Sequence, residues 1–393
     1  MALYVGIDVA KRFHVAALVD EAGTLLHTLR FDNDATGYRH LEQALNGYPA
    51  SPTLVALEST GHYGHALRDW LVDHGCEVHI FNPLKTNRFR DFYIQWHKND
   101  ERDAIALAHL LRFGERHRYE ALPIQLRTLK QMVRHRALLV QARARLKNQV
   151  RAILDEVFPE YQQVPLFTDV FGSASLALLS HYPGPAQLVA VPEGDLLEFL
   201  VQHSRGRIGL PRVRLILETA QHSIGSQAAG QAYQPILPTF ILHYLTLSDQ
   251  VDHYTAQLQA CLAPLDQSLT TIPGIGPVLA ATILAEIGHV QRFPTSDHLV
   301  AFCGLALSES QSRQLLPRRF LSRRGSTHLR AAFFQAAVIA VEYDSHLKAY
   351  YQRQLQRGLA KRRALLSVAR KLVRICYALL KSGQPYCPST EAK

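Results

Sequence analysis

Long apolar runs, paired cysteine motifs and low-complexity tracts are all missing from this 393-residue chain. No run approaches the roughly 18 apolar residues that a membrane-spanning helix needs, and the opening residues, MALYVGIDVAKRFH, lack the charged and then apolar layout of a signal peptide. The five cysteines are scattered and never form CxxC, so neither a disulfide framework nor a zinc site is indicated. We therefore expect a cytoplasmic protein with reduced thiols and no membrane partner.

Positive charge is concentrated in two segments. The chain has 43 basic and 33 acidic residues, a formal net charge of +10. Residues 121–160 contain 8 basic and 3 acidic groups, and residues 317–374 contain 14 and 2, a net charge of +12, whereas residues 1–120 and 161–316 are net acidic. A charge run is ordinarily a solvated helix face. An excess of this size, mostly arginine, favours a nucleic-acid partner.

The first third of the chain alternates between strand-like and helix-like patterns. Its short β-rich segments are LYVGID, FHVAALVD, TLLHTLRF, TLVALE and EVHIF, and helical patterns follow the third, fourth and fifth of them. Because one core rarely supports 393 residues, we expect several domains. The alternation predicts an α/β domain over residues 1–120, a mixed sheet with flanking helices.

The rest of the chain has a mainly helical pattern. Residues 125–157 contain neither proline nor glycine, and apolar residues recur in steps of seven, which predicts one long helix able to pair as a coiled coil over 121–160. Residues 161–262 are expected to be helices broken at PGP, RGRIGLP and QPILP, without a chemical motif. Residues 263–393 form a further, mostly helical unit.

Four acids occur where an α/β sheet could bring them together. Asp8 closes the first strand in VGIDVAK, and Glu58 closes the fourth in VALEST; Asp100 and Asp103 in KNDERDA would share one helix face. Singly, each could be an ordinary strand-end or helix N-terminal residue. Four neighbouring carboxylates cannot all stay ionised without a cation, and such oxygen ligands suit Mg²⁺ or Mn²⁺. Two such ions can clamp a phosphodiester, so the pattern indicates phosphoryl transfer.

Two other features are candidates for phosphate contacts. The turn PGIGP, with Gly274 and Gly276, precedes the apolar helix LAATILAEIG in a layout like a helix-hairpin-helix element, although a turn that only caps a core helix has the same pattern. Basic side chains of the central helix and of the stretch RRFLSRRGSTHLR are the second candidate. They are Arg143, Lys147 and Arg151 in the helix and Arg318, Arg319, Arg323, Arg324 and Arg330 in the stretch.

Taken in order, these motifs resemble the DEDD transposases of the insertion sequence 110 family, which also includes pilin-type DNA invertases. The resemblance spans nearly the whole chain and rests on VGIDVAK, VALESTGHY, KNDERDA, LKNQVRAIL, IPGIGPVLAATILAEIG, CGLALSESQS, RRGSTHLRAA and VARKLVRICYALL. It implies a RuvC-like (RNase H-like) N-terminal domain in which Asp8, Glu58, Asp100 and Asp103 bind metal. It further implies a coiled-coil connector and a C-terminal transposase domain with a serine nucleophile.

The same resemblance implies the partners. A bacterial or archaeal enzyme of this kind would act on the nucleoid, on double-stranded donor and target DNA chosen by a structured noncoding RNA, called a bridge RNA. Strand exchange needs several cleavage centres, and the apolar stripe of the central helix offers a surface for pairing, so a homodimer or tetramer is expected.

The serine nucleophile falls on Ser312 when the family spacing of eight residues is counted from Gly304. Two neighbours depart from the family pattern, because Leu307 stands in place of a proline and Arg313 follows the serine in place of a glycine. The fallback candidates are Ser308 and Ser310.

Two alternatives stay open from the residues alone. A RuvC-type, Mg²⁺-dependent, structure-selective endonuclease would use water as its nucleophile and leave the cut strands unjoined. A non-catalytic nucleic-acid-binding regulator would bind without a metal ion and without strand scission.

Overall fold

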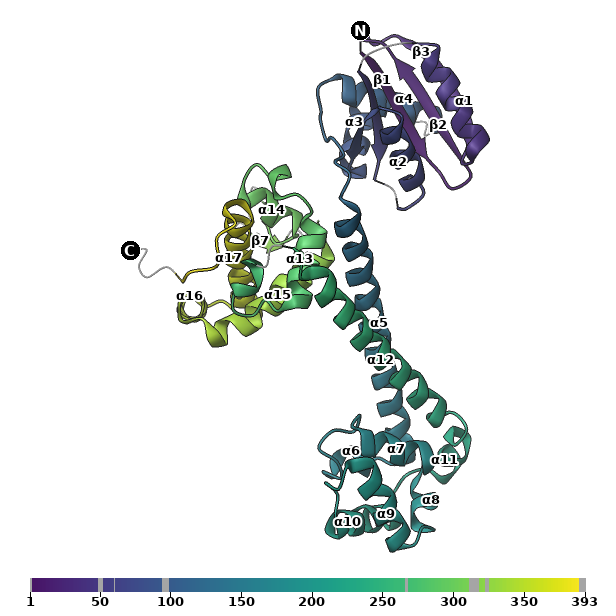
Figure 1. Ribbon diagram of the computed structural model, residues 1–393, viewed down its shortest axis with the longest axis vertical. Helices are drawn as coiled ribbons and strands as arrows, with labels where there is room; N and C mark the ends of the chain where they lie inside the picture. Colours follow the sequence, from purple (N-terminus) through teal and green to yellow (C-terminus); the bar gives the residue numbers. More distant parts are fainter. Residues whose placement is uncertain are drawn as a thin grey trace. The chain divides into compact units, whose positions relative to one another are not determined.

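The computed structural model describes residues 2–48, 52–59, 61–93, 99–265, 268–310, 318–321 and 325–388, with the backbone alone for residues 84, 90–93, 308–310 and 318–321. The chain divides into two compact units, Met1–Ala121 and Leu122–Lys393 (Figure 1). Within the described ranges, no helix is both long and apolar enough to cross a membrane.

A five-stranded mixed sheet is the centre of the N-terminal unit. Its strand order is β3-β2-β1-β4-β5, in which β1, β2 and β3 are antiparallel neighbours and β4 and β5 run parallel to β1. The strands are β1 (Leu3–Val9), β2 (Phe13–Val19), β3 (Leu25–Asp32), β4 (Thr53–Glu58) and β5 (Glu77–Phe81). The five strands expected from the sequence are confirmed, as is the mixed sheet expected of a RuvC-like domain.

Helices cover both faces of this sheet. Val5 and Ile7 of β1 pack in one core with α1 (Ala35–Asn46) and α2 (His65–Asp73). Leu54 and Ala56 of β4 pack in another with α4 (Asp100–Arg112) and α3 (Pro83–Tyr93). Because both faces are buried, the central strands are apolar at consecutive positions rather than at alternate ones.

The C-terminal unit is built on two long helices, α5 (Ile124–Val157) and α12 (Leu237–Leu262). Leu129 of α5 shares a core with Leu258, and Val150 shares a different core with Ile241, so the two helices run antiparallel. The long central helix predicted from the sequence is confirmed. Its apolar stripe packs against α12 of the same chain, and its identification as a coiled coil stays a prediction.

Shorter helices surround the two ends of this pair. The loops PGP, RGRIGLP and QPILP separate helices as expected. At one end lie α6 (Glu160–Gln163), α7 (Ser173–His181), α8 (Pro185–Val189), α9 (Glu193–Ser204), α10 (Leu210–Gln221) and α11 (Gln227–Tyr233). At the other lie η1 (Ser268–Thr271), α13 (Pro277–Ile287), η2 (Val290–Arg292), α14 (Ser296–Phe302), α15 (Thr327–Tyr343), α16 (Ser345–Gln356) and α17 (Lys361–Ser382), with the hairpin of β6 (Leu307–Ser310) and β7 (Arg318–Leu321).

Candidate functional site

Asp8 and Glu58 lie side by side at the ends of two neighbouring strands. β1 and β4 are parallel, and Ile7 is opposite Leu57, so the next pair along the strands is Asp8 and Glu58. Successive side chains of a strand point to opposite faces, and Gly6, two residues before Asp8, faces α4. The two carboxylates therefore project on the α4 side of the sheet.

The helix α4 brings the other two acids to the same end of the sheet. A Cβ atom on Gly6 would lie 1.9 Å from the Ala104 carbonyl oxygen, so α4 crosses β1 directly over this glycine. At the far end of α4, the Arg112 guanidinium donates to the carbonyl of Glu21, whose carboxylate accepts from the Ala2 N–H just before β1 begins. Because α4 thus runs against β1, its first turn lies where β1 ends.

Asp100 and Asp103 are in that first turn, and Asn99 caps the helix by accepting a hydrogen bond from the Glu101 N–H at 3.2 Å. Asp100 is exposed and Asp103 is half-buried. Acids in the first turn of a helix are also favoured by the helix dipole, so their position alone does not identify a metal site.

The four acidic side chains do not form a closed metal-binding cluster in the part of the chain that the structure describes. Asp8 and Glu58 are half-buried, and Glu58 is oriented by the Thr86 hydroxyl, which donates to its Oε1 at 2.9 Å. All-oxygen donors of this kind suit Mg²⁺ or Mn²⁺. Among the residues that the structure describes, no three His, Cys, Asp or Glu side chains come close enough together to hold a metal ion. The fold thus gathers the acids at one sheet end without assembling a finished coordination shell.

The serine position lies outside the described residues, as do Arg313, Arg323 and Arg324. The described backbone shows an antiparallel hairpin in which Ser308 pairs with Phe320 and Ser310 pairs with Arg318. Ser312 is therefore in the segment that joins β6 to β7, and the backbone of Arg319 lies on β7 opposite Glu309. Sequence reasoning missed this hairpin.

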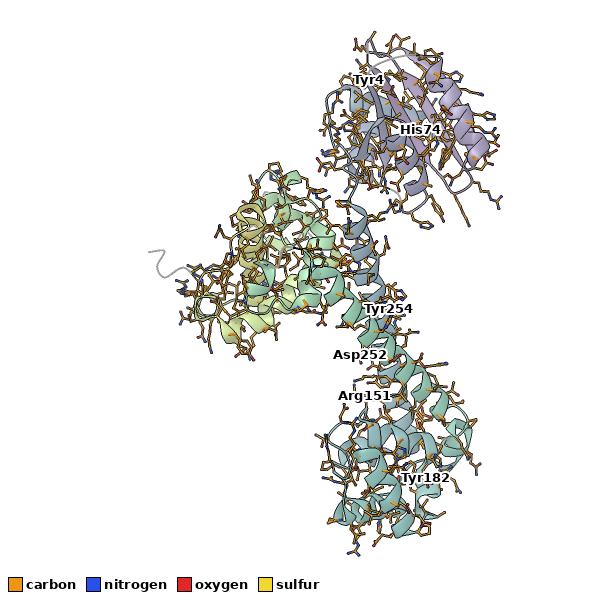
Figure 2. All side chains as sticks on the ribbon, viewed as in Figure 1. Tyr4, His74, Arg151, Tyr182, Asp252 and Tyr254 are labelled. Atoms are coloured by element: carbon orange, nitrogen blue, oxygen red, sulfur yellow. The ribbon has the colours of Figure 1, made fainter. Side chains whose placement is uncertain are left out.

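Two of the basic side chains expected to bind nucleic acid lie on aromatic rings. The Lys147 ammonium is 4.7 Å from the ring centroid of Phe171 and 5.5 Å from that of Tyr244, and the Arg151 guanidinium is 5.4 Å from that of Phe171. Arg151, on α5, is labelled in Figure 2. These cation–π contacts hold both cations against Phe171, just before α7, and hold Lys147 against Tyr244 of α12, so part of their charge stabilises the fold.

The two glycines of the PGIGP turn differ. Gly274 has φ of +89°, and a Cβ there would lie 2.5 Å from the carbonyl oxygen of Ala336 on α15, so close helix packing requires this glycine. Gly276 is exposed, has open space where a Cβ would be, and is the N-cap of α13. Of the two, Gly276 is the one whose position leaves it accessible to a phosphate. Arg330 on α15 is half-buried.

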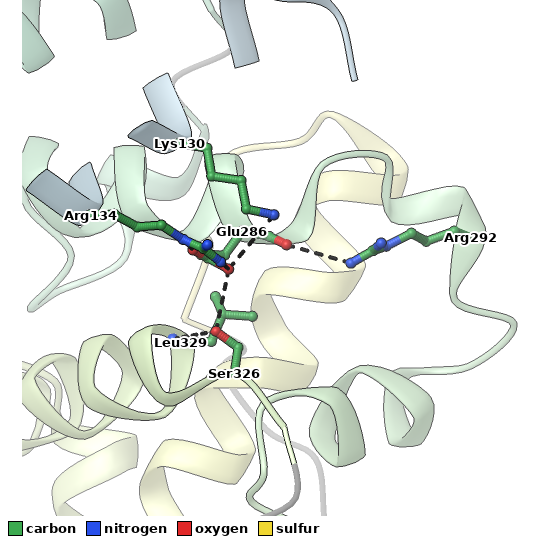
Figure 3. A network of polar contacts seen from close by, with 6 residues as sticks. All are labelled: Lys130, Arg134, Glu286, Arg292, Ser326 and Leu329. Atoms are coloured by element: carbon green, nitrogen blue, oxygen red, sulfur yellow. Dashed lines mark hydrogen bonds and ion pairs between the residues drawn. The ribbon is translucent and has the colours of Figure 1, made fainter. Parts of the chain in front are cut away.

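A buried carboxylate that sequence reasoning missed lies in the last turn of α13 (Figure 3). Glu286 is 2% exposed; the Arg134 guanidinium donates to both of its oxygens, at 2.6 and 3.1 Å, and the Lys130 ammonium is 3.9 Å away. Burial pushes the pKa of Glu286 up, but the hydrogen bond from Arg134 and the charges of Lys130, Arg134 and His328 outweigh burial and lower it. The carboxylate is therefore ionised and compensated by α5. Removing one partner of a buried pair typically costs about 3–5 kcal/mol.

Comparison with known proteins identifies two family models along the chain. Residues 5–159 match the DEDD transposase model of the IS110 type, and residues 266–352 match the transposase model of the IS116/IS110/IS902 family. Together the two matches cover the carboxylates, α5, α13, the β6–β7 hairpin and α15.

Similar proteins that match over most of their length carry names of the same kind. An "insertion element IS110 uncharacterized 43.6 kDa protein" of Streptomyces coelicolor is 26% identical over 98% of this chain and 96% of its own length. The mini-circle putative transposase for IS117 of the same organism is 28% identical over 91% of this chain and 89% of its own. A pilin gene-inverting protein of Moraxella bovis is 24% identical over 98% and 97%.

A solved structure, RuvC of T. thermophilus in complex with a Holliday junction substrate, aligns with 30% of this chain and all of its own. The TM-score is 0.24 and the sequence identity 15%.

Proposed function

Because the chain belongs to the IS110 family of transposases, we propose that it is a recombinase that cuts and rejoins strands of double-stranded donor and target DNA. The observation that supports the proposal is that β1 and β4, which end at Asp8 and Glu58, end beside the first turn of α4, which contains Asp100 and Asp103. Acids in that arrangement suit phosphodiester chemistry, and relatives named for transposition and gene inversion support DNA as the substrate.

The four carboxylates are the proposed ligands of Mg²⁺ or Mn²⁺. When bound, such ions would neutralise the charge that develops on the scissile phosphate. Other residues of the chain position these ligands. The Thr86 hydroxyl orients Glu58, and Asn99 caps the first turn of α4, which contains Asp100 and Asp103.

Ser312 is the proposed nucleophile, with Ser308 and Ser310 as the alternatives. Its oxygen forms a bond to phosphorus while the bond to one DNA oxygen breaks, and the serine proton passes to that oxygen, which leaves as a hydroxyl. A DNA hydroxyl then attacks the phosphoserine ester, which rejoins the strand and restores the serine. Because the ester conserves the energy of the broken bond, rejoining needs no external energy source.

A structured noncoding RNA is the proposed guide. Base pairing would select the DNA, while the protein would contact backbones through Arg143, Lys147, Arg151, Gly276 and Arg330, and through the basic residues of the hairpin region. These latter residues are Arg318, Arg319, Arg323 and Arg324. Gly274 was a further candidate, but its packing against α15 favours a structural role.

Four segments follow from this proposal: a metal-binding RuvC-like domain over 1–120, a coiled-coil helix over 121–160, a helical connector over 161–262, and a transposase domain with a helix-hairpin-helix-like element over 263–393. Strand exchange between two duplexes makes a homodimer or tetramer the proposed active form, because several cleavage centres are needed. Its proposed place of action is the cytoplasmic nucleoid.

The first test is cleavage by the protein purified together with its copurifying RNA, which is sequenced to define the matching DNA substrates. Asp8→Asn should abolish Mg²⁺-dependent cleavage and joining. Asp73→Asn is the matched control, because Asp73 is an exposed acid of α2, a helix that packs on the opposite face of the sheet. Normal cleavage by a folded Asp8→Asn variant would remove the carboxylates from the mechanism, and products that are cut but never joined would indicate a nuclease.

The second test locates the nucleophile. Stalled reactions on nicked DNA should yield one DNA-linked peptide by mass spectrometry, and this peptide should contain Ser312. Ser312→Ala should give neither adduct nor joined product, whereas Ser308→Ala and Ser310→Ala should give both. An adduct that persists in Ser312→Ala would reassign the nucleophile.

A further inference from the structure

The two ends of the segment that contains the β6–β7 hairpin are held together. The Ser326 N–H donates to the carbonyl of Phe302 at 2.8 Å. A Cβ on Gly325 would lie 2.3 Å from that carbonyl oxygen and 2.6 Å from the Gly304 N atom, so backbone packs directly on backbone there. The hairpin therefore leaves and re-enters the helical unit at one tightly packed point between α14 and α15.

Ser326 joins this point to the buried carboxylate on α13. Its hydroxyl is the N-cap of α15, accepting a hydrogen bond from the Leu329 N–H at 3.2 Å, and it lies 3.4 Å from Oε2 of Glu286. A hydroxyl has one proton to donate. Because Leu329 supplies its own N–H, that proton is directed at Glu286 (Figure 3).

Glu286 in turn is fixed by α5. Lys130 and Arg134 are four residues apart, on one face of that helix, and both point at the same carboxylate. A carboxylate near the C-terminus of a helix is disfavoured by the helix dipole. The two cations offset that cost, and the Arg292 guanidinium is bound to the Glu286 carbonyl, so the end of α13 is held from two sides.

We propose that Glu286 is a positioning residue for strand cleavage, which sets the foot of the β6–β7 hairpin relative to α5 through its contact with Ser326. The inference rests on the proposed function, because its importance comes from the serine nucleophile that this hairpin would bear. It assigns to Glu286 no contact with DNA. The contacts run from α5 through Glu286 and Ser326 to the Phe302 carbonyl, where the segment that contains the hairpin leaves the helical unit, and all of them lie within the C-terminal unit.

A pair of substitutions at Ser326 tests the contact. Asparagine and aspartate are both good N-caps, so Ser326→Asn and Ser326→Asp should both keep α15 capped. Only aspartate places a second negative charge beside Glu286. We expect Ser326→Asn to recombine at close to the wild-type rate, and Ser326→Asp to lose about 10- to 100-fold in the rate constant of cleavage, the usual effect of a small misplacement of a reacting group.

The assay places the coding sequence with its native flanking DNA on a plasmid and counts recombined junctions by quantitative PCR; cleavage by purified protein with its copurified RNA gives the rate constant. Affinity for a generic DNA duplex should be unchanged in Ser326→Asp, so the loss is in the rate and not in binding. The defect should deepen as pH rises, because at lower pH the two neighbouring carboxylates can share a proton. Ser326→Asn should show no such pH dependence.

A second variant separates positioning from folding. Ser326→Asp/Glu286→Gln restores a single negative charge at the junction, and we expect it to recover most of the lost rate. Equal rates for Ser326→Asp and Ser326→Asn, or a double variant as slow as Ser326→Asp although it melts like the wild type, would overturn the inference. If the wild-type protein itself neither cuts nor joins DNA, the proposed function fails instead, which the wild-type lane of the same assay shows.

Discussion

The crossing of α4 over β1 gives the most direct structural prediction, because it depends on a single absent side chain. A Cβ on Gly6 would lie 1.9 Å from the carbonyl oxygen of Ala104, 2.5 Å from the Ala108 N atom and 2.9 Å from the Leu107 Cβ. Two of these three are backbone atoms of a buried helix, so no side-chain rotation relieves the contact. Gly6→Ala must therefore move α4 away from the sheet.

The size of the effect follows from these distances. Ordinary van der Waals contact begins near 3.4 Å, so the helix has to move by about 1.5 Å, and overpacking of this kind costs about 1–3 kcal/mol of unfolding free energy or more. The same movement carries Asp100 and Asp103 away from Asp8. We expect affinity for a divalent cation to fall by about 10- to 100-fold, as it does when the groups supporting metal ligands are altered.

Urea unfolding followed by circular dichroism measures the first effect, and titration with Mn²⁺ followed by electron paramagnetic resonance measures the second. Gly47→Ala is the control, since a Cβ there lies 3.4 Å from the nearest atom and Gly47 has φ of −66°. If Gly6→Ala unfolds at the same urea concentration as Gly47→Ala, α4 does not cross β1 as described. If it is destabilised but binds Mn²⁺ unchanged, the fold stands and the carboxylate site is refuted.

Three further outcomes are expected. Arg134→Met should lower the unfolding free energy by about 2–4 kcal/mol, somewhat less than for a fully enclosed pair because the Arg134 side chain is 43% exposed; Arg134→Met/Glu286→Leu should regain most of this loss in the same urea titration. Burial lowers the pKa of His14 below its ordinary value of 6.5. The contribution of His14 to the free energy of unfolding should therefore be complete above about pH 6.5 and should be lost as the pH falls toward the depressed pKa. A melting temperature of His14→Phe that depends on pH as strongly as that of the wild type would contradict this. Arg362→Ser/Arg363→Ser should reduce the slope of log affinity for duplex DNA against log salt by about one for each phosphate that the variant no longer neutralises, measured by fluorescence anisotropy.

Sequence patterning predicts the N-terminal unit well because its signals are local. Each strand is a short β-rich run that ends at a turn, and the acids Asp8 and Glu58 occupy strand ends that parallel register then places together. The helix 125–157 was likewise expected nearly to the residue, since a long stretch without proline or glycine has few alternatives. The spacing of the four acids in the sequence could not predict the distances between their carboxylates, because these distances depend on how α4 packs across the sheet.

The C-terminal unit contains the features that sequence could not supply. Glu286 occurs in an apolar helix, AEIG, and its partner Arg134 is 152 positions away in the chain, so no local pattern marks the pair. The β6–β7 hairpin was missed because its strands have four residues each, below the length at which alternation is distinctive. The one available signal was an acid inside an otherwise apolar helix, which needs a buried partner.

The positions of the cations change how the basic charge of the chain should be interpreted. A count along residues 121–160 treats every basic group of α5 as available to nucleic acid. However, Arg134 compensates Glu286, Lys147 lies on the rings of Phe171 and Tyr244, and Arg151 lies on the ring of Phe171.

By contrast, Lys361, Arg362 and Arg363 are all exposed and form the first turn of α17. Cations at a helix N-terminus are opposed by the helix dipole and contribute nothing to the stability of that helix. A cluster that the fold disfavours and solvent surrounds is better explained by an external polyanion than by packing. The salt dependence of DNA binding should therefore arise more from α17 than from α5, where Arg134, Lys147 and Arg151 already have partners within the fold.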